Sequence, residues 1–443
     1  MTGRPRTTST SPSPTTPSSR PGRAAALSLG AMALCASLTA GCGVLPSVTG
    51  DAGDTVKVMT WAPQDTGATN KPGMPAMALA YARWINSHGG LNGRKLEVLT
   101  CNDHNDSVAA AKCARRAAAE NVVAVVGSYS QFGDSFLAPL ESAGIPYIGG
   151  YGVTDDEFTG PMSYPVNGGQ PALLAGLGRA LGTSCGRVAL VRPDSIAGDQ
   201  LPAMLDSGLK AAGHPEAGDQ LVAEDLTGYD DQSGRALRFA SGDTPRKGCV
   251  VPALGDRTDT FMDSFRRVRA DFPAVRLGTV LGSVDQTMIN STGGASGPYE
   301  GAYVTGWYPP ASDPRWKPMK RVISEEAFDD NRIDPGDAGV QTTWIAYTVF
   351  KAVLDKIGGG EVSADSVRKT LDGGLRVSTG GLTPTLNWPY EGKLASVGFP
   401  RMVNADVTLQ VVRGGELVAA GKSVGGIDGT TDMTGTLENA DVR

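Results

Sequence analysis

The chain has 443 residues, which exceeds the size of one typical domain and predicts two. Hydrophobic residues make up 40% and charged residues 19%, as in ordinary globular proteins. The net charge is −6, and the first 41 residues hold four arginines and no acid, so the remainder carries −6 − 4 = −10. Such an acidic surface argues against a nucleic-acid-binding protein, which needs clustered lysine and arginine.

The first 41 residues predict an export signal rather than part of the fold. Two arginines precede an apolar stretch at 24–38, which is too short for a membrane span. The stretch ends in Leu38–Cys42 (LTAGC), which resembles the lipobox of bacterial lipoproteins, with threonine where leucine is commonest. We therefore expect lipidation at Cys42 and a tether at 42–54. A plain signal peptide cleaved nearby is the alternative.

Export leads to an oxidising compartment, in which cysteines pair. Four cysteines remain beyond Cys42, and four cysteines allow three connectivities. Cys101 ends an expected strand, and Cys113 lies on the expected helix that follows. Cys185 and Cys249 each stand just before an expected strand, and neighbouring strands would bring them side by side. The sequence therefore favours a 101–113 bridge and a 185–249 bridge.

The part of the chain that follows the tether alternates strands with helices. The helix at 75–88 places an aromatic stripe on one face at spacings of three and four, which indicates packing against a sheet. The strands expected here are 56–60 and 95–100, and the helices are 75–88 and 107–120.

The next stretch, at 122–154, predicts a βαβ unit. A buried apolar strand at 122–126 is followed by a helical pattern and a second strand at 145–148. Ligands sit beyond the carboxyl ends of strands in open parallel sheets, and free N–H groups at helix N-termini favour anions. Ser128–Gln131 and Gly152–Thr154 therefore form a candidate cradle for a carboxylate. Two ordinary loops are the alternative.

The rest of the chain continues the alternation, which predicts parallel sheets and an α/β fold. Residues 383–420 are expected to hold short strands and turns, and 421–443 to be a flexible tail. The strands expected are 187–191, 221–225, 250–254, 277–281 and 303–306, and the helices are 171–181, 201–213, 233–240, 258–270, 316–331 and 340–357.

Four motifs in this order of elements carry a family resemblance. They are the turn Gly89–Arg94 (GGLNGR), Val125–Ser130 (VVGSYS), Ala143–Pro146 (AGIP) and Leu386–Trp388 (LNW). With them the chain resembles the leucine/isoleucine/valine-binding proteins, which are type I substrate-binding proteins of ABC importers. The resemblance extends over most of residues 55–415 as an order of elements.

The resemblance implies a two-lobed type I periplasmic-binding-protein fold, with a parallel sheet flanked by helices in each lobe and the ligand between the lobes. The N-terminal lobe would comprise 55–166 plus 307–395, and the C-terminal lobe 167–306 plus 396–420. The glycines within 167–169 and Gly306 suit hinges, because glycine accepts the backbone changes of closure.

The resemblance also implies where an amino acid would bind. Ser130 would contribute a hydroxyl to its carboxylate, with Gln131 in the same loop. Thr154 would add a hydroxyl and an amide, and Gly152 or Val153 a carbonyl for the ammonium group. Trp61 would pack over the apolar part of the ligand.

An acidic residue of the second lobe usually pairs with the ammonium group in this family. Asp256 and Asp285 directly follow expected strands and are the candidates, because a buried ligand charge needs a partner. A helix N-cap is the alternative role for each. Ala197-Gly198 stands where many members carry an aromatic residue before a glycine, so the contact from the second lobe differs.

These observations predict a lipid-anchored extracytoplasmic protein that binds an amino acid or similar small polar solute and delivers it to an ABC permease. We expect a monomer that is not an enzyme and needs no cofactor. We also expect no metal site, because the three histidines stand apart without the spacing of metal ligands. A sensory receptor of the same fold is one alternative, and a lipid-anchored hydrolase is another. Hydrolysis of supplied esters or amides would identify the hydrolase.

Overall fold

The computed structural model describes most of residues 55–440. The predicted signal segment, Cys42 and the tether at 42–54 lie outside the described residues, and so do the side chains of Asp256 and Thr287. The further positions outside the description are 68, 196–197, 224–225, 243–246, 281–283, 390–391, 397, 421–428 and 441–443.

A five-stranded parallel sheet, the first sheet, organises one half of the described chain. Its strands are β1 (Thr55–Trp61), β2 (Lys95–Cys101), β3 (Ala124–Val126), β4 (Tyr147–Ile148) and β5 (Ser163–Tyr164), and the helices around it are α1 (Gly73–Ser87), α2 (Ser107–Ala119), α3 (Gly133–Ala143), α4 (Asp156–Thr159), α10 (Lys317–Glu326), α11 (Ala338–Ile357) and α12 (Ala364–Asp372). The strand order is β2-β1-β3-β4-β5.

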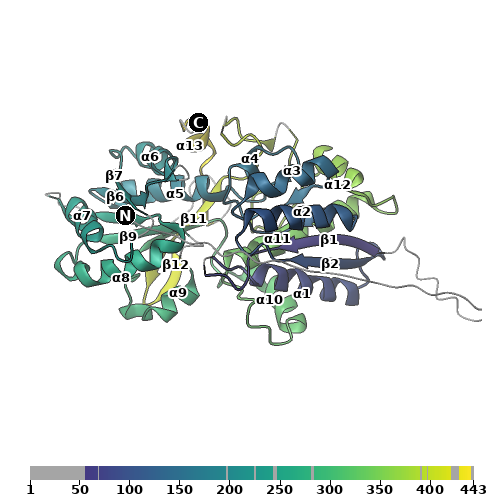
Figure 1. Ribbon diagram of the computed structural model, residues 1–443, viewed down its shortest axis with the longest axis horizontal. Helices are drawn as coiled ribbons and strands as arrows, with labels where there is room; N and C mark the ends of the chain where they lie inside the picture. Colours follow the sequence, from purple (N-terminus) through teal and green to yellow (C-terminus); the bar gives the residue numbers. More distant parts are fainter. Residues whose placement is uncertain are drawn as a thin grey trace, which may run out of the picture. The chain divides into compact units, whose positions relative to one another are not determined.

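Side chains of the first sheet alternate between two helical layers, as the period of a strand requires. Met59 and Trp61 belong to the apolar cluster that contains α2 and α3, whereas Val56 and Val58 belong to the cluster that contains α1 and α11. Figure 1 shows α2 and α3 on one side of β1 and β2, and α1 on the other. Both faces of the sheet are therefore buried, which explains the continuous apolar sequences of its strands.

An eight-stranded mixed sheet, the second sheet, organises the other half. Its strands are β6 (Val188–Pro193), β7 (Gly218–Val222), β8 (Cys249–Pro252), β9 (Arg276–Val280), β10 (Tyr303–Gly306), β11 (Asp406–Arg413), β12 (Glu416–Ala419) and β13 (Thr430–Asp432), and its helices are α5 (Gly169–Ser184), α6 (Leu201–Ala211), α7 (Asp230–Ser241), α8 (Thr258–Val268), α9 (Gln286–Ser291) and α13 (Thr434–Glu438). The order is β12-β11-β10-β9-β8-β6-β7, and β13 pairs with β11. Strands β6 to β10 are parallel, whereas β11 runs antiparallel to β10.

Several expected elements differ in extent from those observed, among them one helix and two strands. The strand expected at 221–225 lies at Gly218–Val222 and is an edge strand, in which Leu221 is 48% exposed and Val222 is buried. The helix expected at 316–331 ends at Glu326, because Phe328 and Asp329 have positive φ angles of 51° and 61°. The strand expected at 122–126 extends only over Ala124–Val126.

The expectation of a flexible tail over 421–443 is wrong for residues 429–440. Strand β13 continues the second sheet, and Met433 and Leu437 are fully buried against it and its helices. Glu438 also accepts a hydrogen bond from the amide of Ala395 at 2.8 Å. Two apolar side chains among small polar residues were too weak a pattern to predict this C-terminal element.

Both favoured disulfide bridges are present in the structure. Cys101 and Cys113 join the end of β2 to α2, with 5.9 Å between their Cα atoms. Cys185 and Cys249 join the chain before β6 to the start of β8, with a Cα distance of 5.8 Å. The second bridge forms because β6 and β8 are neighbours, as their register shows.

The chain passes between the two sheets at three places, which hydrogen bonds tie together. These crossing segments precede α5, follow β10 and precede β11. The side chain of Asn167 donates to the hydroxyl of Tyr308 at 3.1 Å, and the indole of Trp307 donates to the carbonyl of Gly169 at 2.9 Å. Asn404 donates to the carbonyl of the residue before Asn167 at 3.0 Å. The three crossings are thus coupled to one another.

Candidate functional site

The loop that follows β4 is held by a carboxylate of the chain itself. The amides of Gly152, Val153 and Thr154 donate to the carboxylate of Glu157 at 3.0, 2.9 and 3.2 Å. The Thr154 hydroxyl lies 3.4 Å from the same group, and Glu157 is 2% exposed. The expectation that this loop offers a free amide cradle to the carboxylate of a ligand is therefore wrong. An internal carboxylate already occupies the cradle.

Gly152 also has internal partners. Its carbonyl accepts a hydrogen bond from the amide of Gln170 at 3.0 Å. Its φ angle is +87°, and a Cβ atom would lie 2.8 Å from Asn167 Oδ1 and from the Cα of Gly169. Glycine is required here by conformation and by close packing.

Glu157 carries a shifted pKa because of its surroundings. Burial raises the pKa of its carboxyl group to about 7, although the hydrogen bonds from the three loop amides oppose the shift. The loop is thus held by a group that titrates near neutral pH.

Trp61 is a core residue rather than a ligand contact. Its side chain is fully buried, and its ring packs on Phe136 and Tyr147 with centroid distances of 5.4 and 6.0 Å. Position 61 points away from the helical layer of α1 and α11 and into the layer of α2 and α3. The prediction that Trp61 covers a solute is therefore wrong, because strand alternation sends its ring into the core.

Ser130 and a buried acid that the sequence analysis missed lie at the carboxyl edge of the first sheet. Ser130 is 1% exposed and accepts a hydrogen bond from the amide of Phe132 at 3.3 Å. Asp103 follows β2 and is fully buried, and its Oδ2 atom has no hydrogen-bond partner within the described part of the chain. Burial raises the pKa of Asp103, while a hydrogen bond from Ser130 opposes the shift. An acid just after a strand was the available signal for this residue.

The remaining predicted site residues, Gln131, Asp285 and Asp256, belong to different segments of the chain. Gln131 is exposed and donates to the hydroxyl of Tyr129 at 3.1 Å. Asp285 caps α9 by accepting from the amide of Met288 at 2.8 Å, which is the alternative role considered above. Asp256 lies in a short 3₁₀ helix, Gly255–Arg257, but its side chain is outside the description.

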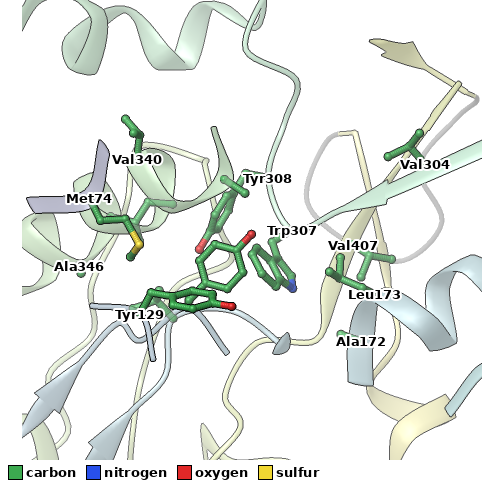
Figure 2. Packing of buried hydrophobic residues seen from close by; sticks show 14 of the residues in the cluster. Met74, Tyr129, Ala172, Leu173, Val304, Trp307, Tyr308, Val340, Ala346 and Val407 are labelled. Carbon is green, nitrogen blue, oxygen red and sulfur yellow. The ribbon is translucent and has the colours of Figure 1, made fainter. Parts of the chain in front are cut away.

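An aromatic cluster that the sequence analysis did not identify joins segments from the two sheets. Tyr151, from the loop after β4, packs edge-on against Tyr129 and against Trp307, with centroid distances of 5.0 Å in both cases. All three residues are at most 4% exposed. Figure 2 shows Trp307 between Tyr129 on one side and Leu173 of α5 on the other. We call Tyr129, Tyr151 and Trp307 the aromatic cluster.

Lys71 brings a positive charge to this cluster. Its ammonium group lies 3.1 Å from Asp337 Oδ2 and 5.4 Å from the centroid of the Tyr151 ring. Burial opposes the charge of Lys71, but Asp337 and the neighbouring phenols outweigh that effect and raise its pKa above the ordinary value. The lysine is therefore a buried cation at the carboxyl edge of the first sheet.

Two surface cavities lie elsewhere, on the second sheet. They have volumes of about 370 and 130 Å³, and both are lined by Ser184 and Tyr303. The larger one also contacts Arg276 and the bridged Cys249. Neither is lined by a predicted ligand-binding residue, so size alone does not identify the site.

The sequence of this chain, which forms two α/β sheets joined by three crossings, matches a known protein family. Residues 64–389 match the model of the periplasmic binding proteins. The chain belongs to that family. No curated protein matches the sequence. Within the described residues of this periplasmic binding protein, no helix is long and apolar enough to cross a membrane, and no group of three or more His, Cys, Asp or Glu side chains is arranged for a metal ion.

Solved structures share the fold at low sequence identity. A possible leucine/isoleucine/valine-binding protein from Rhodopirellula baltica is 12% identical with a TM-score of 0.67, covering 83% of this chain and 97% of its own. A solute-binding protein of an ABC transporter from Rhodopseudomonas palustris, in complex with 3,4-dihydroxybenzoic acid, is 17% identical with a TM-score of 0.65, covering 86% and 98%. A substrate-binding periplasmic protein from Ralstonia solanacearum is 17% identical with a TM-score of 0.64, covering 82% and 99%.

Proposed function

We propose that the protein is a lipid-anchored, extracytoplasmic solute-binding protein that captures an amino acid or related small carboxylate and delivers it to an ABC importer. The observation that carries this proposal is the family match over residues 64–389, which includes the carboxyl edges of both sheets. Solved neighbours described as ABC transporter proteins bind hydroxybenzoic acids, and another is described as a possible leucine/isoleucine/valine-binding protein. Both classes of solute are small carboxylates.

A small solute retained by the protein is the first test. The protein is purified without denaturation and analysed by native mass spectrometry, and the expected result is an added mass below that of a short peptide. Released material is then identified after denaturation. Protein that carries no solute and retains none from a mixture of amino acids and organic acids would argue against a binding function. A permease and an ATPase encoded beside it would favour the importer over a sensory receptor.

Ser130 is proposed to contact the bound solute, because its hydroxyl lies at the carboxyl edge of the first sheet. A hydrogen bond to a charged group contributes roughly 1.5–3 kcal/mol. Ser130→Ala is therefore expected to weaken binding about ten- to a hundredfold in calorimetric titration with the retained solute. Thr154→Ala is the matched control, since the Thr154 hydroxyl faces Glu157 and its loss should change affinity little. Equal affinities for Ser130→Ala and wild type would remove Ser130 from the site. Gln131 and Asp285 remain proposed contacts of lower priority.

The lipid anchor at Cys42 is tested separately in cells. Cys42→Ser removes the acylated sulfur, so the protein should be released to the medium or remain unprocessed through its signal segment. Fractionation followed by immunoblotting checks this, with Cys35→Ser in the same segment as the control. Processed Cys42→Ser protein that stays on the membrane like wild type would rule out lipidation at this position.

A further inference from the structure

Lys71 has hydrogen-bonding capacity that its known partner does not use. An ammonium group has three donors. Asp337 accepts one of them, and no other acceptor for Lys71 is found among the described residues. The side chain is 10% exposed, so water reaches it little. The remaining donors of this buried cation are available to an acceptor that does not belong to the described chain.

The hydroxyl of Tyr151 points to the same requirement. Tyr151 is 4% exposed, and within the described residues its hydroxyl has no hydrogen-bond partner. Burial raises the pKa of this phenol, so it is a donor at neutral pH. Buried hydroxyls without a partner are rare in folded proteins and call for a specific explanation.

Resting on the function proposed above, we infer that Lys71 and the Tyr151 hydroxyl together receive the carboxylate of the solute, while the rings of Tyr129 and Trp307 pack against its apolar body. The two donors belong to neighbouring side chains, since the Lys71 ammonium is 5.4 Å from the Tyr151 ring centroid. The amides of the loop after β4 do not compete for this role, because Glu157 accepts them. A lysine and a phenol thus replace the amide cradle as the anion subsite.

The charges around the anion subsite favour a solute whose anionic group carries a single negative charge. Asp337 neutralises part of the Lys71 charge, and Asp285 lies within electrostatic range of the Tyr151 hydroxyl. A doubly charged phosphate would be repelled by these two acids more strongly than a carboxylate would. An ammonium group on the same solute would balance the charge of Asp285. Amino acids and simple carboxylic acids therefore share the carboxylate, and they differ in whether an ammonium group is present.

Matched compounds separate these possibilities. Wild-type protein, freed of any retained solute by unfolding and refolding, is titrated with leucine, phenylalanine and 4-hydroxybenzoate, and with the corresponding amides, in which the carboxylate is neutral. The inference predicts that at least one carboxylate binds, and that its amide binds at least tenfold more weakly. Preference for leucine or phenylalanine identifies an amino acid, whereas preference for 4-hydroxybenzoate identifies a simple aromatic acid.

Tyr151→Phe is the most direct variant, because it removes a hydroxyl that has no partner within the described chain. We expect the variant to melt at or above the wild-type temperature and to bind the preferred carboxylate about ten- to a hundredfold more weakly. Tyr308→Phe is the matched control. Its hydroxyl bonds to Thr342 and Asn167 at 3.0 and 3.1 Å, so this variant should lose stability and keep its affinity.

Lys71 is tested by charge. Lys71→Met should reduce affinity for the carboxylate at least tenfold and leave that for its amide unchanged, whereas Lys71→Arg should retain most of the affinity. If Lys71→Met does not fold, because Asp337 loses its partner, the Lys71→Met/Asp337→Asn double variant replaces it.

Any of three titration results overturns the inference. They are equal binding of the carboxylate by Tyr151→Phe and wild type, binding of no carboxylate in the panel, and binding of an amide as tightly as its acid. The proposed function is decided independently by the solute that co-purifies, so a retained neutral or cationic compound would refute the anion subsite and leave solute binding intact.

Discussion

At the scale of single residues, the notable feature is a carboxylate that belongs to the chain and not to a ligand. Glu157 accepts three consecutive loop amides and is almost completely buried. Three amides directed at one point form a concave anion site. This interaction fixes the loop that carries Tyr151, and it therefore sets the position of the aromatic cluster at the candidate site.

Glu157 should make stability depend on pH. Its pKa is raised from 4.5 to about 7 in the folded protein, so the folded state binds this proton more tightly than the unfolded state. The resulting stabilisation is present below about pH 4.5 and is lost as the pH rises through about 7. Between pH 5 and pH 8 the loss should be roughly 2–3 kcal/mol. Urea unfolding of wild type and Glu157→Gln at both pH values measures it.

The glutamine variant is neutral at both pH values and supplies the control. The difference between wild type and Glu157→Gln isolates the carboxyl group, because buried Asp103 contributes a shift of the same direction to both proteins. Identical pH dependence in the two proteins would mean that the pKa of Glu157 is the same in the folded and unfolded states.

At the scale of secondary-structure elements, the C-terminal segment adds to the second sheet after the region that matches the family model. Strand β13 pairs with β11, and Met433 and Leu437 are fully buried. The matched region ends at residue 389, before this segment begins. Its contacts with α5 and α6 connect it to the helical layer of the second sheet.

The buried side chains of this segment should contribute to the stability of the whole protein. Met433→Ala and Leu437→Ala are each expected to lower the free energy of unfolding by about 2–5 kcal/mol, because each leaves a cavity in a packed core. Asn439→Ala, at an exposed position of the same segment, should change it by less than about 0.5 kcal/mol. Urea unfolding checks all three. Alanine variants as stable as wild type would show that the segment is dispensable to the fold.

The sequence predicts the order of elements well and the site poorly. Alternating apolar strands and amphipathic helices mark the α/β fold, and cysteines before adjacent strands indicate the bridge between Cys185 and Cys249. Trp61 and the 152–154 loop were misplaced because strand alternation and loop folding decide where a ring or an amide points. Lys71 and Trp307 are far apart in the sequence and belong to no common motif, so only the folded chain brings them to the same aromatic cluster.

At the scale of the whole described chain, we expect the three crossings to control how the two sheets move relative to one another. Their side chains bond to one another through Asn167, Tyr308 and Asn404, and Trp307 bonds across to Gly169. Hinge motion needs a few residues that absorb backbone changes, and we expect Gly169, with a φ angle of +55°, to be one of them. Because Trp307 joins this hinge region to Tyr151, solute binding and sheet movement should be coupled at that ring.

Trp307 should therefore report solute binding through its fluorescence. Its indole is 2% exposed, bonds to the Gly169 carbonyl and packs on Tyr151, so a shift of either partner changes its environment. We expect the retained solute to change the intrinsic emission of wild type, and Trp307→Phe to abolish most of that change while the other five tryptophans remain. Trp316→Phe is the control, since Trp316 is fully buried and bonds to Pro309 on the side of the first sheet. A full signal in Trp307→Phe, with affinity unchanged, would show that binding does not act through this crossing.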